Sequence, residues 1–183
     1  IQVSIDARGI QFSDLVRFAG DYQDDAGYPF VVGGEGGGTV VAAGSGVTQV
    51  EPGDKVLVPA GCVEIVNVSE KAATRGPYGV DLKVASSFRN NYLTALDGLT
   101  RAGLQPGETL LVHGAAGGVG LAAVDVGKLM GASVIGTASS DEKLAVVKQM
   151  GADQVINYNN GFREQVKQLT SGLGADVIYD PVG

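Results

Sequence analysis

Apolar and polar positions change their rhythm near the middle of the chain. In the first half, apolar residues alternate or stand in short runs, which predicts strands at the N-terminus and near 39–43, 55–59 and 63–68. Glycine and proline separate these runs at 44–46 and 52–54. One short helix is expected at 13–19, with Ser13 as its N-cap. The first half is therefore predicted to be a small, mostly-β unit.

The second half alternates between the two kinds of periodicity. A long helix is predicted at 84–102. Beyond it we expect strands near 109–113, 133–137, 154–157 and 176–180, and helices near 117–130, 140–150 and 161–171. Strict alternation of this kind is typical of a parallel sheet with right-handed crossovers. The predicted fold class is therefore α/β, a partial doubly wound (Rossmann) sheet of strand order 3-2-1-4, with domains at 1–83 and 84–183.

The glycine cluster after the first parallel strand carries the candidate chemistry. An apolar run, 109–112, is followed by Gly114-x-x-Gly117-Gly118-Val119-Gly120 and then by a helical pattern. This order is typical of a nucleotide-binding turn, in which backbone amides at a helix N-terminus bind a pyrophosphate. The alternative is a tight turn with a purely structural role, because glycine-rich turns are common.

Composition and charge exclude several other classes. The 183 residues are 44% hydrophobic and carry a formal net charge of −7, and Lys and Arg form no cluster, so no nucleic-acid partner is expected. The single cysteine excludes an intrachain disulfide and any cysteine-based zinc site. No apolar run approaches the roughly 18 residues of a membrane span. A reducing, cytoplasmic location is expected. Both ends fall within strand-like patterns, so we expect a piece of a longer protein.

Five motifs resemble one family. The chain is similar to the zinc-independent quinone oxidoreductases, the zeta-crystallin-like group of the medium-chain dehydrogenase/reductase superfamily, at residues 9–15, 33–38, 112–120, 137–143 and 174–183. The resemblance covers essentially the whole chain. It implies a partial GroES-like domain at 1–83 and a partial NADP-binding Rossmann domain at 84–183 that lacks its C-terminal strands. It also implies a homodimer for the full-length protein.

The zinc ligands of related dehydrogenases are replaced in this sequence. Where zinc-dependent relatives have a Cys-His pair and a further His, this chain has Gln11, Phe12 and Gly34. Glu35 alone cannot hold the ion, since a catalytic zinc takes about three protein ligands. We therefore expect no metal site. Without a Lewis acid, hydride transfer to an already electrophilic acceptor is favoured over alcohol oxidation.

The second parallel strand indicates which cofactor is bound. NAD-selective folds place an acid at the tip of this strand, but here Ser139, Ser140 and Lys143 follow it, and that set suits a 2′-phosphate. A role for Ser139 as a helix N-cap is compatible with this. The family resemblance implies that a serine and a lysine here bind the phosphate of NADPH, and that a tyrosine at the position of Tyr158 lies beside it.

Other site residues are implied by the resemblance alone. Tyr22 stands at the position of a family active-site tyrosine, although a packing role is an equal alternative. Thr94 matches a family threonine near the cofactor. Gln11 replaces the family's asparagine, which reaches towards the nicotinamide. His113, the single histidine, is interpreted as a partly buried residue that shapes the turn.

The resulting hypothesis is an NADPH-dependent oxidoreductase that transfers hydride to a quinone or a similar small electrophilic acceptor. One alternative is an enoyl or 2-alkenal reductase on the same scaffold. Another is a non-catalytic relative that binds NADPH. We expect this stretch by itself to be inactive, because an apolar edge strand at 177–179 would lack its neighbour.

Overall fold

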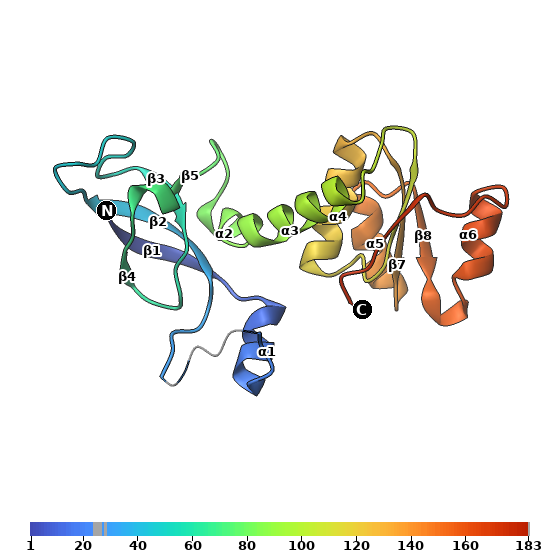
Figure 1. Ribbon diagram of the computed structural model, residues 1–183, viewed down its shortest axis with the longest axis horizontal. Helices are drawn as coiled ribbons and strands as arrows, with labels where there is room; N and C mark the ends of the chain where they lie inside the picture. Colours follow the sequence, from blue (N-terminus) through green and yellow to red (C-terminus); the bar gives the residue numbers. More distant parts are fainter. Residues whose placement is uncertain (24–26, 28, 183) are drawn as a thin grey trace. The chain divides into compact units, whose positions relative to one another are not determined.

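The computed structural model describes residues 1–23, 27 and 29–182. The chain divides into two compact units, Ile1–Arg89 and Asn90–Gly183. Figure 1 labels helices and strands of both units, although β6 and β9 carry no label there. Assignment of functional domains with a boundary at 83/84 stays a prediction. In the described part of the chain, no helix has both the length and the apolar character needed to cross a membrane.

The first unit is built on an antiparallel sheet of order β4-β1-β2-β3-β5. Its strands are β1 (Gln2–Gly9), β2 (Glu35–Ala42), β3 (Lys55–Val58), β4 (Ile65–Asn67) and β5 (Thr74–Arg75). Alternating residues of β1, β2 and β3 enter one apolar core, which contains Val3, Val40 and Val56. The mostly-β prediction is confirmed. β2 begins at Glu35, four residues earlier than the pattern predicted, because glycines 36–38 give no apolar signal.

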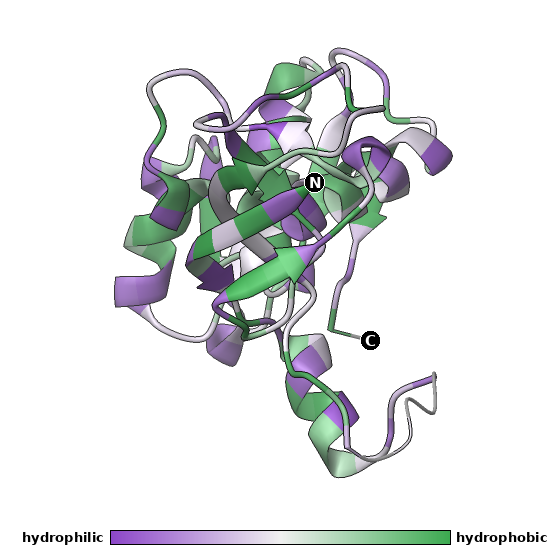
Figure 2. Cartoon of the chain, turned by 90° about the vertical axis from the view of Figure 1, so that its left-hand side faces the viewer, coloured by the Kyte–Doolittle hydropathy of each residue, from purple (hydrophilic) through white to green (hydrophobic). Residues whose placement is uncertain are grey.

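Helix α1 (Phe12–Ala19) follows β1 directly. Its N-cap is Gln11, so the prediction of Ser13 was wrong. The backbone amide of Gln11 donates to Asp14 Oδ2 at 2.8 Å. With this contact the helix begins at Phe12, one residue before the predicted start. Phe12, Leu15 and Phe18 are exposed apolar residues of α1. Green segments on the lowest helix in Figure 2 mark the apolar positions of α1.

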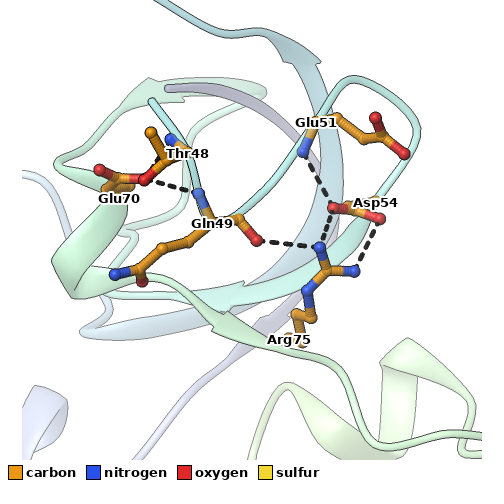
Figure 3. A network of polar contacts seen from close by, with 6 residues as sticks. All are labelled: Thr48, Gln49, Glu51, Asp54, Glu70 and Arg75. Carbon is orange, nitrogen blue, oxygen red and sulfur yellow. Dashed lines mark hydrogen bonds and ion pairs between the residues drawn. The ribbon is translucent and has the colours of Figure 1, made fainter. Parts of the chain in front are cut away.

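A polar network holds the loops at the other side of this sheet. Glu70 lies in the short 3-10 turn η1 (Glu70–Ala72). Its Oε2 accepts the backbone amides of Thr48 and Gln49, each at 3.0 Å (Figure 3). Arg75 binds Asp54 across 3.0 Å and also donates to the Gln49 carbonyl at 2.9 Å. The two backbone amides, Thr48 first and Gln49 second, lower the pKa of the Glu70 carboxyl.

Glu70 should therefore make the stability of the chain depend on acid pH. A lowered pKa means that the contribution of Glu70 is present above its ordinary value of 4.5 and is lost as pH falls through the folded value. We expect Glu70→Gln to lower the melting temperature at neutral pH, and the difference from the unaltered chain to shrink below pH 4.5. Thermal unfolding between about pH 3 and pH 7 measures this. Glu51→Gln is the control, because the Glu51 carboxylate points away from the network (Figure 3); equal curves for both variants would contradict the assignment.

The helix predicted at 84–102 is two helices. α2 (Leu82–Ala85) and α3 (Phe88–Arg101) are separated by Ser86 and Ser87. The hydroxyls of these serines donate to the carbonyls of Lys83 and Val84 at 3.1 and 3.3 Å. Such side-chain bonds compete with the helical ladder and end α2. The apolar periodicity continues across the break, and for that reason the sequence pattern missed it.

The second unit is a parallel sheet of order β8-β7-β6-β9. Its strands are β6 (Thr109–Val112), β7 (Ser133–Ala138), β8 (Gln154–Asn157) and β9 (Val177–Tyr179), joined by helices α4 (Gly118–Leu129), α5 (Asp141–Gln149) and α6 (Arg163–Leu169). The predicted order 3-2-1-4 is confirmed. Leu110 and Val112 share a core with residues of α3, α4 and α5, whereas Leu111 packs with Val166 of α6. Helices thus cover both faces of the sheet, as in a doubly wound fold.

Candidate functional site

The N-terminus of α4 lies where β6 ends. The turn between them is fixed by the Ala115 amide, which donates to the Thr137 carbonyl on β7 at 2.9 Å. Gly117 is the N-cap, with extended backbone angles, and Gly117 and Gly118 are exposed. The first-turn amides of an α-helix have no acceptor within the helix, and α4 has no acidic residue in its first turn. This end of α4 can therefore accept an anion.

Two glycines of the turn differ in whether their surroundings leave room for a side chain. A Cβ built on Gly120 would lie 2.4 Å from the Gly114 carbonyl oxygen and 2.7 Å from Ala115 Cα, closer than real atoms approach. The same atom on Gly117 would meet only the Gly114 oxygen, at an ordinary 3.4 Å. Gly120 is thus needed for the turn to pack on its own helix. Gly117 leaves the outer surface of the turn open.

A second polar group lies beyond the end of β7. Ser140 is the N-cap of α5 and its hydroxyl accepts the Lys143 amide at 3.4 Å, so an N-cap role for Ser139 is wrong. The Ser139 hydroxyl is instead 3.3 Å from Lys143 Nζ. Tyr158 follows β8 in the 3-10 turn η2 (Tyr158–Asn160) and is 42% exposed. Ser139 and Lys143 are brought together, and both they and Tyr158 follow the carboxyl ends of neighbouring strands.

Sequence reasoning missed the residues that hold this group. Asn159 donates its Nδ2 to the Ser139 carbonyl at 2.7 Å, and Asn157 donates its Nδ2 to Asp141 Oδ1 at 3.3 Å. The available signal was the pair of asparagines that flank Tyr158. Asparagine is common in turns, however, so the sequence alone does not distinguish such a role from turn formation.

His113 shapes the inner side of the turn. Its Nδ1 lies 3.1 Å from the hydroxyl of Thr137, which is fully buried, and its ring meets Phe162 edge to face at 4.7 Å. His113 is partly buried, as predicted. Its contacts tie the ends of β6 and β7 together below the glycine turn.

Helix α3 carries Thr94 and packs on α4. Thr94 is exposed, and its carbonyl accepts the Tyr179 hydroxyl at 3.2 Å. Tyr92 donates to Asp125 Oδ2 at 2.7 Å; burial and then this carboxylate raise the pKa of Tyr92 to about 12. Its hydroxyl therefore remains a donor at neutral pH. A role of Thr94 toward the cofactor stays a prediction.

The remaining predicted residues belong to the first unit. The Gln11 carboxamide donates to the Glu35 carboxylate, which is 2% exposed. Asp14 Oδ1 accepts the Gly33 amide at 3.1 Å. Tyr22 is exposed, and the Arg17 guanidinium lies 4.6 Å from the centre of its ring. The roles of Gln11 and Tyr22 in binding and catalysis stay predictions.

The positions of the zinc ligands in related dehydrogenases do not fit a metal. Phe12 and Gly34 are exposed, and Gln11 is engaged by Glu35. Within 1–23, 27 and 29–182, no three His, Cys, Asp or Glu residues gather in a group that could hold a metal ion. A side-chain set without three such ligands cannot form a catalytic zinc centre.

Comparisons with known proteins identify two domain families in the chain. The family described as "Alcohol dehydrogenase GroES-like domain" matches residues 1–89, and the family described as "Zinc-binding dehydrogenase" matches residues 118–183. A "Quinone oxidoreductase-like protein 2 homolog" of Nematostella vectensis is 40% identical over 190 residues, covering 100% of this chain and 52% of the relative. The chain thus spans about half the length of the curated relatives it matches.

Two solved structures extend the comparison. The quinone oxidoreductase of Escherichia coli complexed with NADPH has a TM-score of 0.88 and 34% identity, over 100% of this chain and 58% of that one. CurK enoyl reductase has a TM-score of 0.84 and 28% identity, over 97% of this chain and 57% of that one. The two domain families and the fold place the chain among the medium-chain dehydrogenases/reductases. Within that superfamily, the chain belongs to the quinone oxidoreductase-like family.

Proposed function

We propose that the protein is an NADPH-dependent oxidoreductase that transfers hydride to a quinone or a similar electrophilic acceptor. One observation carries the proposal: the Ser139 hydroxyl and the Lys143 ammonium lie 3.3 Å apart beyond β7, where an NAD-selective fold places an acid. The relative from Escherichia coli, which was solved with NADPH, supports the same cofactor.

The chain's own residues would bind and orient the cofactor. The amides of Gly118, Val119 and Gly120, with the open surface at Gly117, would hold the pyrophosphate at the N-terminus of α4. Ser139, Lys143 and Tyr158 would hold the 2′-phosphate by charge-assisted hydrogen bonds. NADPH, when bound, supplies the hydride. The replaced zinc ligands favour an acceptor that needs no Lewis acid, and hence reduction over alcohol oxidation.

The proposal is tested by cofactor binding and turnover in the same preparation. We expect NADPH fluorescence to change on addition of the chain, at a dissociation constant at least about tenfold below that of NADH. The chain has no tryptophan, so protein fluorescence interferes little. In the complete protein, a benzoquinone should speed NADPH oxidation. Equal affinity for both cofactors would contradict the assigned phosphate site.

A second candidate is reduction of an activated carbon–carbon double bond. The similarity to CurK enoyl reductase favours this candidate, because a protein with the same fold is named there as an enoyl reductase. Turnover of quinones compared with α,β-unsaturated carbonyls separates the two candidates. We further propose that the complete protein is cytoplasmic, as the single cysteine indicates, and that it is a homodimer, as the family resemblance implies. A non-catalytic role would be indicated by NADPH binding with neither acceptor reduced.

A further inference from the structure

Two asparagines connect the three segments of the phosphate site. Asn157 ends β8 and Asn159 lies in η2, on either side of Tyr158. The Asn159 carboxamide donates to the Ser139 carbonyl at 2.7 Å, across twenty positions of the chain. The turn that carries Tyr158 is therefore attached directly to the residue that follows β7.

Asn157 uses both ends of its side chain. Its Oδ1 accepts the Asn159 amide at 3.1 Å and so caps η2. Its Nδ2 donates to Asp141 Oδ1 at 3.3 Å, at the first residue of α5. The Asn157 carboxamide thus caps the turn that carries Tyr158 and also holds the Asp141 carboxylate next to the proposed phosphate site.

The acids of the first turn of α5 carry negative charge, which opposes an anionic ligand, so the places where their carboxylates are held affect the site. Asp141 is bound by Asn157, and the Glu142 carboxylate accepts from its own backbone amide and then from the Ser140 hydroxyl, which lowers the pKa of Glu142. Within the described residues, Lys143 has no acidic group within ion-pair distance. Its ammonium is directed to the Ser139 hydroxyl instead. The charge of Lys143 therefore stays available to a ligand despite two neighbouring acids.

We propose that Asn157 and Asn159 are positioning residues that set the preference for a 2′-phosphate. Asn159 holds the turn of Tyr158 against Ser139, and Asn157 keeps the Asp141 carboxylate on the β8 side of the site. The inference rests on the proposed function, because it assigns a role in the same phosphate site. Neither asparagine touches the reacting atoms, and both act through Ser139, Tyr158 and Asp141.

The test compares two nucleotides that differ only in the 2′-phosphate. Adenosine 2′,5′-bisphosphate and adenosine 5′-monophosphate are titrated into the full chain by calorimetry, and the ratio of their dissociation constants is the readout. Asn159→Leu removes the donor without a change of charge, and we expect the ratio to fall about tenfold. Asn157→Ser keeps a capping oxygen but is too short to reach Asp141, and we expect a loss of about threefold.

Two further variants separate positioning from folding. Asn160→Leu lies in the same turn and should leave the ratio unchanged. Asp141→Asn in the Asn157→Ser background should restore the ratio, because the released carboxylate is then neutral. Thermal unfolding of each variant confirms that it is folded.

The outcomes distinguish this inference from the proposed function. If the unaltered chain binds both nucleotides equally, the phosphate site itself fails. If it prefers the bisphosphate and Asn159→Leu keeps that preference, the positioning role is overturned alone. An equal loss of affinity for both nucleotides would also overturn it, because a merely structural role affects both alike.

Discussion

Lys143→Ala is expected to weaken NADPH binding by at least about tenfold and to leave NADH binding within about twofold. The Lys143 ammonium lies 3.3 Å from the Ser139 hydroxyl and forms no ion pair within the described residues, so its charge is available to the 2′-phosphate. A charge-assisted hydrogen bond contributes about 1.5–3 kcal/mol, and the exposure of Lys143 places its effect at the lower end. Fluorescence titration of each cofactor measures the two affinities.

The matched control removes the same charge elsewhere in the unit. Lys167 lies on α6 and pairs with Glu164 at 3.3 Å, so Lys167→Ala changes the net charge equally without touching the site. We expect this variant to bind both cofactors normally. A parallel loss of NADPH and NADH affinity in Lys143→Ala would show that Lys143 supports α5 rather than the phosphate.

Gly120→Ala is expected to destabilise the chain by about 3 kcal/mol and to abolish binding of both cofactors. The added Cβ would lie 2.4 Å from the Gly114 oxygen. That oxygen belongs to the backbone and the Cβ position is fixed by its own Cα, so neither atom can rotate away. Alanine gains about 1 kcal/mol of helix propensity over glycine, which does not offset the overlap. Urea unfolding followed by circular dichroism measures the loss of stability.

Gly117→Ala separates the steric requirements of fold and ligand. Its Cβ would meet the Gly114 oxygen at 3.4 Å, and the φ of −75° suits any residue, so the fold should be retained. Because this residue is exposed at the start of α4, the methyl group should still weaken NADPH and NADH alike. Normal stability of Gly120→Ala, or normal binding by Gly117→Ala, would contradict the assignment of the turn.

Much of the fold could be predicted because its signals are local. The change from period-two patterns to alternating strands and helices predicted both units. The order 3-2-1-4 was predicted as that of a doubly wound sheet, and the structure has this order. Errors occurred where side chains and backbone compete. Ser86 and Ser87 interrupt a helical pattern that continues in its apolar positions, and Gln11 takes the cap predicted for Ser13.

The candidate site was predictable only in part. The glycine spacing at 114–120 and the serines and lysine after β7 are visible in the sequence, because each lies within a few residues of a strand end. The roles predicted for Gln11, Tyr22 and Thr94 came from family resemblance alone and stay predictions. The asparagines around Tyr158 carry no pattern of their own, since their partners lie far along the chain.

By itself, the sequence determined the α/β class, the position of the glycine turn before α4, and the serines and lysine after β7 to which we assign the phosphate site. Periodicity and glycine spacing are properties of residues close together in the chain, and these residues form their helix, strand or turn through local contacts. Only the tertiary structure decided that Ser140 rather than Ser139 caps α5, and that Asn159 holds Ser139 from twenty positions away. Parallel strands bring distant residues to one edge of the sheet, and hydrogen bonds between them form only after the strands have paired.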